Sequence, residues 1–141
     1  MKFDLNKTLE QLENAYWKEP EYQSSLVRTC HKLRKKPLKE FETEDFRILI
    51  GQNISLKILI PMAIDLLEND ILAEGYYYKG DLLNNVLKCE MKYWEENPKE
   101  LKRLCETIEK KKEEIMESDI PRRDKNEIFD LIENMKKKNA C

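Results

Sequence analysis

Residues 54–67, with the sequence ISLKILIPMAIDLL, constrain the fold most, because they are apolar on nearly every side of a helix. A helix that is hydrophobic all round is buried all round. The rest of the chain must therefore wrap other elements around this segment. Pro61 removes a backbone hydrogen bond and clashes with the preceding turn. We therefore expect it either in the first turn after a break or at a kink.

The remaining sequence also has helical periodicity, with apolar residues three and four positions apart. Only 3 of 141 residues are Gly and 5 are Pro, which argues against a sandwich or barrel with many turns. Helix starts are predicted at Thr8, Ser24 or Ser25, Thr43, Asp81, Asn97–Pro98 and Asp119–Pro121. The chain length suits one domain. We expect a single all-α domain over residues 1–141, with six or seven helices around residues 54–67 and a frayed tail.

The inward face of each predicted helix follows from the same spacing. In the first helix the apolar side is Leu9, Leu12 and Tyr16, and Pro20 marks its end. In the second helix, which Pro37 ends, the inward residues are Leu26, Val27, Cys30 and Leu33. In the third helix they are Phe46, Leu49 and Ile50, with Gly51 at its end. Trp17 and Trp94 are expected in the core.

Catalytic and metal-binding patterns are weak. The chain has four cysteines, no CxxC pair and one histidine, His31, so we expect no metal site. Cys30 and His31 are adjacent and point about 100° apart on a helix, so they do not form a catalytic dyad. The three glycines form no phosphate-binding loop. We expect no enzyme activity, no catalytic residue and no cofactor, and a free thiol at Cys141.

Charge is balanced overall, at a net −2, but two stretches differ. Residues 28–39 carry six cations and no acid, whereas residues 40–75 carry eight acids and two cations. Such asymmetry can steer a charged partner. The first residues lack the apolar segment of a signal peptide, and the longest apolar run is too short to span a membrane. We expect a cytoplasmic protein with reduced thiols.

Two other functions remain open at this point. The basic segment 28–39 is compatible with a nucleic-acid-binding regulator, because clustered cations contact phosphates. It has no aromatic residue between Leu26 and Phe41, however, and single-strand binding or base readout favours aromatic or amide groups. A structural adaptor that self-associates through its charged C-terminal helices is the other alternative.

The run Tyr76–Tyr77–Tyr78 is the most informative surface feature. It lies between Gly75 and Gly80, with acids on both sides. Tyrosine is enriched at protein interfaces because it buries a large area at a low entropy cost. We expect at least one ring to be buried and at least one exposed. An aromatic cluster among carboxylates suits a basic protein partner.

The stretch from Leu33 to Leu87 resembles a known family. It contains LRKKPL, then FRILIGQNISLKILIPMAIDLLE, then LAEGYYYKGDLLNNVL, and LEQLENAYWKEP near the start is a looser likeness. In order and spacing these segments resemble the all-helical immunity proteins of bacterial contact-dependent growth inhibition (CDI) systems. The aromatic loop of that family continues with Pro-Gly, where this chain has Lys79-Gly80. From Pro98 onward no family motif is recognised.

The resemblance implies an inhibitor that acts without catalysis. Such proteins bind the C-terminal toxin domain of a delivered effector in the bacterial cytoplasm and block its active site or an adjacent exosite. Many of these toxins are nucleases with basic clefts, which an acidic surface would complement. No membrane partner is expected. The predicted partner-binding residues are Glu68, Asp70, Glu74, Tyr76, Tyr77, Tyr78 and Asp81, with Glu42, Glu44 and Asp45 as a second acidic patch.

Overall fold

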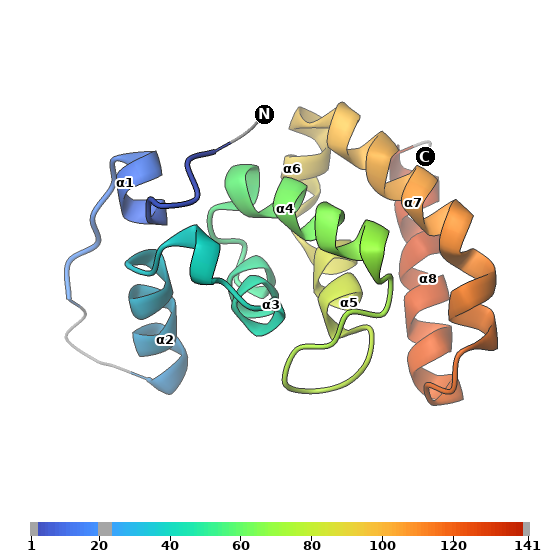
Figure 1. Cartoon of the computed structure of the whole chain (residues 1–141). Coiled ribbons are helices and arrows are strands. Elements are labelled where there is room, and N and C mark those ends of the chain that lie inside the picture. The colour runs from blue at the N-terminus through green and yellow to red at the C-terminus, as the bar shows by residue number, and fades with distance from the viewer. Residues whose placement is uncertain (1–2, 20–23, 140–141) are drawn as a thin grey trace.

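The computed structural model describes residues 3–19 and 24–139 (Figure 1). These residues contain eight α-helices and no β-strand, which confirms the all-α prediction. The helices are α1 (Leu9–Glu13), α2 (Ser25–Arg34), α3 (Thr43–Gly51), α4 (Leu56–Asn69), α5 (Asp81–Lys88), α6 (Met91–Glu96), α7 (Pro98–Glu117) and α8 (Arg122–Asn139), with a 3-10 turn, η1 (Leu38–Glu40), before α3. The helix beyond the expected six or seven is α6, for which the sequence analysis predicted no start.

Helix α4 lies at the centre of the arrangement, as predicted. It packs against α3, α5 and α7, while α8 packs against α5 (Figure 1). Its inner side chains Leu59, Ile60, Ala63, Ile64 and Leu67 are completely inaccessible to solvent. Burial of this face removes apolar surface from water and is the main source of stability here.

The expectation that α4 is buried on every side is wrong. Lys57, Asp65 and Glu68 are exposed, and Pro61 beside them is half-buried. These residues recur at three- and four-residue spacing and form one stripe along the helix. A single polar stripe on an otherwise apolar helix keeps the charged groups in water.

Pro61 lies inside α4 rather than in a first turn after a break. It cannot donate a hydrogen bond to the preceding turn, and it lies on the polar stripe of the helix rather than on the buried face. Arg103 of α7 covers this place. Its Nη1 donates to the Pro61 carbonyl oxygen at 3.3 Å, and its Nη2 pairs with Asp65 and, at 2.6 Å, with Glu68. Arg103 therefore ties α7 to the polar stripe of α4.

Most helix starts agree with the sequence to within about one residue, whereas α4 begins at Leu56, two residues after the predicted start at residue 54. Thr8 accepts a hydrogen bond from the Gln11 N–H, and Ser24 accepts one from the Val27 N–H. Helix α3 begins one residue earlier than expected, because Glu42 rather than Thr43 is its N-cap. Helix α3 ends at Gly51, and α7 begins at Pro98 after Asn97, both as predicted.

Several side chains predicted to face the core are exposed. Helix α1 ends at Glu13, and Asn14 then takes a left-handed backbone conformation, so Tyr16 leaves the helical stripe and is 64% exposed. Leu26 is also exposed, whereas Cys30 and Leu33 of the same helix are buried as predicted. Trp94 is buried as predicted, but Trp17 is 40% exposed.

Arg34 holds the N-terminal segment in place. It is 2% exposed, pairs with Glu13, and donates to the Ala15 carbonyl oxygen at 2.6 Å. The Trp17 ring covers its guanidinium at 4.4 Å. A buried cation is tolerated only with such partners. Trp17 therefore lies at the surface because its ring packs on the guanidinium of Arg34 rather than in the core.

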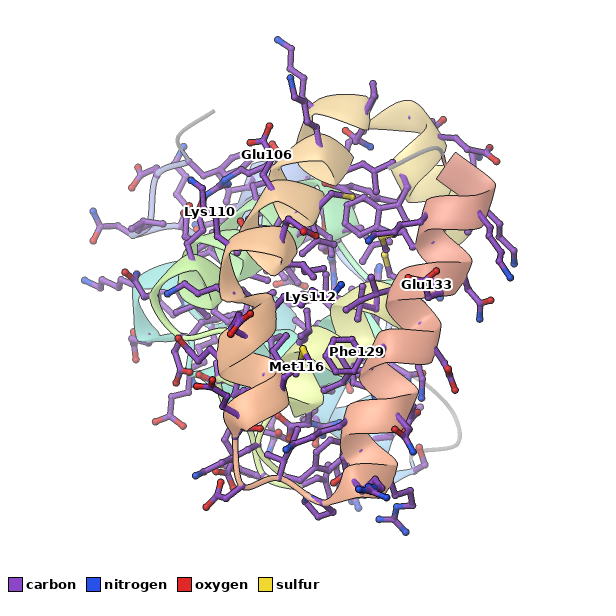
Figure 2. All side chains as sticks on the ribbon, turned by 90° about the vertical axis from the view of Figure 1, so that its right-hand side faces the viewer. Glu106, Lys110, Lys112, Met116, Phe129 and Glu133 are labelled. Atoms are coloured by element: carbon purple, nitrogen blue, oxygen red, sulfur yellow. The ribbon has the colours of Figure 1, made fainter. Side chains whose placement is uncertain are left out.

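Helices α7 and α8 form one edge of the molecule, seen face-on in Figure 2. Met116 of α7 is exposed, and Phe129 of α8 is half-buried against the core. Helix α8 continues to Asn139. The predictions for Pro20, for the end of the tail and for the Cys141 thiol fall outside the described residues. Within those residues, no helix has both the length and the apolar content needed to cross a bilayer.

The burial of α4 predicts a large loss of stability for Ile64→Ala. The variant deletes buried methyl groups and leaves a cavity, so we expect the free energy of unfolding to fall by about 3 kcal/mol. Urea denaturation measures this. Lys57→Ala, on the exposed stripe of the same helix, is the matched control, with a change of less than about 0.5 kcal/mol. Equal losses for the two variants would contradict the position of α4.

Candidate functional site

The loop between α4 and α5 projects from one edge of the molecule (Figure 1). We call residues 74–80 the tyrosine loop. Its ends are joined by an isolated antiparallel bridge between Glu74 and Lys79, and the Gly80 N–H donates to the Leu72 carbonyl oxygen at 3.2 Å. Gly80 has a φ of 91°, a left-handed conformation that glycine adopts without strain. The loop is therefore closed before α5 begins.

Asp81 stabilises the tyrosine loop from inside. Its carboxylate accepts hydrogen bonds from the backbone N–H groups of Gly75 at 2.7 Å, Tyr77 at 3.1 Å and Tyr78 at 3.4 Å. Asp81 is 2% exposed. The sequence predicted Asp81 as the cap of α5, but the N-cap is Gly80. The side chain of Asp81, predicted to bind a partner, is turned toward the loop backbone and buried.

Glu44 joins α3 to the same loop. Its Oε1 accepts a hydrogen bond from the Tyr76 N–H at 2.8 Å, and it is 4% exposed. A Cβ on Gly75 would lie 2.5 Å from this oxygen, so only glycine allows the carboxylate to approach the backbone. The structure thus brings together one member of each predicted acidic patch, Glu44 and Asp81. Both are buried supports rather than surface groups.

Arg47 completes the network and was missed by the sequence analysis. Its Nε and Nη2 each donate to a different oxygen of Glu44 at 2.6 Å, and its Nε lies 3.8 Å from Asp81. Its guanidinium also lies 4.3 Å from the centre of the Tyr77 ring. One available signal was that Arg47 is one of only two cations among the eight acids of residues 40–75.

The electrostatics of Glu44 follow from these contacts. Burial alone would raise the pKa of its carboxyl group. The hydrogen bonds from Arg47 and from the Tyr76 N–H, together with the charge of Arg47, outweigh this effect and hold the pKa below its ordinary value. Glu44 is therefore an ion-paired carboxylate, not a candidate proton donor.

The three rings of the tyrosine loop differ in exposure. Tyr76 is 76% exposed and Tyr77 is 72% exposed, whereas Tyr78 is half-buried. The expectation of a buried ring is therefore met only in part. Burial raises the pKa of Tyr78, and the carboxylates of Glu127, Asp124 and Asp81 raise it further. Two of these acids belong to α8, so α8 faces the loop at Tyr78.

The other acids predicted to bind a partner do not form one cluster with the tyrosine loop. Glu42 and Glu74 are exposed, and Asp70 is exposed at the start of the connection to α5. Glu68 instead pairs with Arg103 of α7. Asp45 is half-buried and pairs with Lys36 at 2.7 Å. The structure therefore brings Tyr76 and Tyr77 together with Glu44, Arg47 and Asp81, and these five residues form the candidate site.

The candidate site presents aromatic rings to solvent above a set of paired charges. The charged groups under the rings are paired with one another, and the two rings themselves are directed to solvent. Across the ranges 3–19 and 24–139, no three His, Cys, Asp or Glu side chains are grouped so as to hold a metal ion. A rigid loop with exposed aromatic rings is typical of a protein-binding surface.

Comparison with known proteins gives one match. A family model described as CDI immunity proteins matches residues 11–104, two thirds of the chain. This range includes α2 to α6, the tyrosine loop and the start of α7, whereas α8 lies outside it. No curated protein and no solved structure matches the chain.

The lowered pKa of Glu44 predicts a loss of stability in acid. Because the folded pKa lies below the unfolded one, the stabilisation is present above the ordinary value of 4.5 and is lost as the pH falls through the folded pKa. Glu44→Gln cannot titrate, so it should lose less stability between about pH 5.5 and about pH 3 than the unmodified chain. Urea denaturation at both pH values measures the difference.

Glu68 and Glu127 also have lowered pKa values and remain in this variant, so the acid dependence should shrink rather than disappear. An equal loss in the two proteins would contradict the pairing of Glu44.

Proposed function

The chain belongs to the CDI immunity proteins, and we propose that it neutralises a cognate toxin domain by binding it through the tyrosine loop. Binding would occlude the toxin's active site or an adjacent exosite by steric and electrostatic means, without catalysis, in the cytoplasm of the producing bacterium. The proposed toxin is a basic protein, a nuclease.

One observation carries this proposal. Tyr76 and Tyr77 expose about three quarters of their surface, although the backbone N–H of each donates to a buried carboxylate. A loop held in one conformation before binding loses little entropy when it binds, so its aromatic side chains contribute more to affinity. Exposed tyrosines on a rigid support are the usual anchors of a tight interface.

The charge near the loop supports a basic partner. Glu74 is exposed within the tyrosine loop, and Glu42 and Asp70 are exposed on the segments that flank the loop and the Glu44 network. Residues 40–75 carry a net −6 in sequence, of which Asp45, Asp65 and Glu68 pair with cations from outside this range, so the exposed acids Glu42, Asp70 and Glu74 carry the argument. Negative charge of this kind accelerates association with a positive surface and disfavours acidic competitors. A nuclease, which must attract a polyanion, has such a surface.

The nucleic-acid alternative is weakened by the pairing of the basic segment. Of its six cations, Arg34 is buried against Glu13, Lys36 pairs with Asp45, and Lys35 lies 3.4 Å from Glu19. Cations that are neutralised by neighbouring carboxylates contribute little to phosphate binding. A salt-dependent affinity for DNA or RNA without a toxin partner would restore this alternative.

The proposed function predicts a stoichiometric complex with the toxin domain encoded beside this chain. The two proteins should co-purify, and toxin activity should be lost when this chain is added in equal amounts. Cells that express the toxin should survive only with this chain present. Absence of both the complex and the protection would overturn the proposal.

The tyrosine loop predicts which substitution weakens the complex. Tyr77→Ala should raise the dissociation constant for the toxin more than about tenfold, because a buried tyrosine anchor is worth about 2 kcal/mol. Tyr16→Ala is the matched control, since Tyr16 is equally exposed but lies in the N-terminal segment. Calorimetry measures both. Equal affinities of the two variants would place the interface elsewhere.

A further inference from the structure

A second surface feature lies away from the tyrosine loop. A pocket of about 420 Å³ opens between the N-terminal segment, α4 and the start of α7. Phe3, Leu12 and Pro61 form part of its apolar wall, and Tyr93, Asn97 and Glu100 supply polar groups. A pocket with apolar walls and a few convergent polar groups is the usual form of a small ligand site.

Two polar atoms of this pocket's residues have no hydrogen-bond partner. The hydroxyl group of Tyr93 and the Oε2 atom of Glu100 are buried without a hydrogen bond, and Tyr93 is only 4% exposed. The Oε2 atom has an ion-pair contact with Arg103, at 3.7 Å. Burying such a group without a partner is destabilising, and it is uncommon in folded proteins. A ligand that bonds to both atoms would recover this free energy.

The third polar group is the side-chain amide of Asn97, of which only the NH2 group is hydrogen-bonded. Its Nδ2 donates to the Tyr93 carbonyl oxygen at 2.8 Å, which leaves its amide oxygen as an acceptor. The residues that line the pocket therefore include three acceptors without a hydrogen bond: the amide oxygen of Asn97, the hydroxyl oxygen of Tyr93 and a carboxylate oxygen of Glu100. An alkylammonium group has three N–H donors on a short apolar stem.

We propose that this pocket binds an alkylammonium group, with its nitrogen between Tyr93, Asn97 and Glu100 and its stem against Phe3, Leu12 and Pro61. The ammonium would donate to the oxygens that lack a hydrogen bond, and the stem would cover the apolar wall. Either a lysine side chain of a protein or a free amine has this chemistry.

The charges around the pocket leave Glu100 as the available counter-ion. Glu13 is already held by Arg34 and by the hydroxyl of Ser55 at 2.9 Å. Arg103 lies 3.7 Å from Glu100 but only 2.6 Å from Glu68, so it satisfies Glu100 poorly. Lys57 also lines the pocket, but its side chain belongs to the exposed stripe of α4 and can extend into solvent.

A titration with n-butylammonium tests the charge requirement. Two-dimensional NMR should show saturable shifts of the backbone signals at Tyr93, Asn97 and Glu100. The neutral analogue n-butanol should bind at least about tenfold more weakly, because it lacks the charge-assisted hydrogen bonds. Equal binding of the two probes, or no shifts at these residues, would overturn the proposal.

Variants of the polar groups provide the second test. Glu100→Gln should weaken n-butylammonium binding about tenfold. Glu109→Gln, an exposed acid of the same helix, is the control and should leave binding unchanged. Tyr93→Phe should also weaken binding while thermal stability stays equal or rises, since it removes an unpaired buried hydroxyl. Unchanged binding by both Glu100→Gln and Tyr93→Phe would contradict the site.

Two further probes distinguish the sources of the ammonium group. Putrescine represents a free amine, and N-acetyl-lysine methylamide represents a side chain in a protein. Tighter binding of the first would assign the pocket to a small amine, and tighter binding of the second to a lysine of a protein. Failure of both would overturn the proposal, and it would leave the tyrosine loop unaffected because the two sites share no residue.

Discussion

The burial of α4 is the constraint on which the rest of the structure depends. Its inner face is fully shielded, so α3, α5 and α7 must all pack against it. The chain then has to leave α4 and return as α5, and the tyrosine loop is this connection. Arg103 of α7 contacts the polar stripe of α4 through a hydrogen bond to Pro61 and an ion pair with Glu68, and these contacts hold α7 against α4. The position of the candidate site thus follows from the packing of one apolar helix.

Two buried carboxylates hold the backbone of the tyrosine loop in place through hydrogen bonds. Glu44 and Asp81 are nearly inaccessible, and a buried charge without partners would be strongly destabilising. Here backbone N–H groups of the loop and the guanidinium of Arg47 compensate them. The same hydrogen bonds fix the backbone that carries Tyr76 and Tyr77. Stability and presentation of the rings therefore have a common physical cause.

The sequence predicted the helices well because their apolar spacing and capping residues are local signals. It also identified the family, and the matched range of residues 11–104 extends the resemblance seen over Leu33–Leu87. The sequence did not predict the burial of side chains whose environment depends on residues far apart in the chain. Nothing local distinguishes Glu44 and Asp81, which are buried, from Glu42 and Glu74, which are exposed. Likewise, the spacing of Leu12 and Tyr16 could not reveal that Asn14 ends the helix between them.

The most direct test of the central claim is hydrogen exchange of this chain with and without the toxin domain encoded beside it. If the tyrosine loop is the interface, amide protection should rise at residues 74–80 and at the start of α3, while residues 28–39 stay unchanged. Protection confined to α2 or to the outer face of α8, with the tyrosine loop unaffected, would contradict the account.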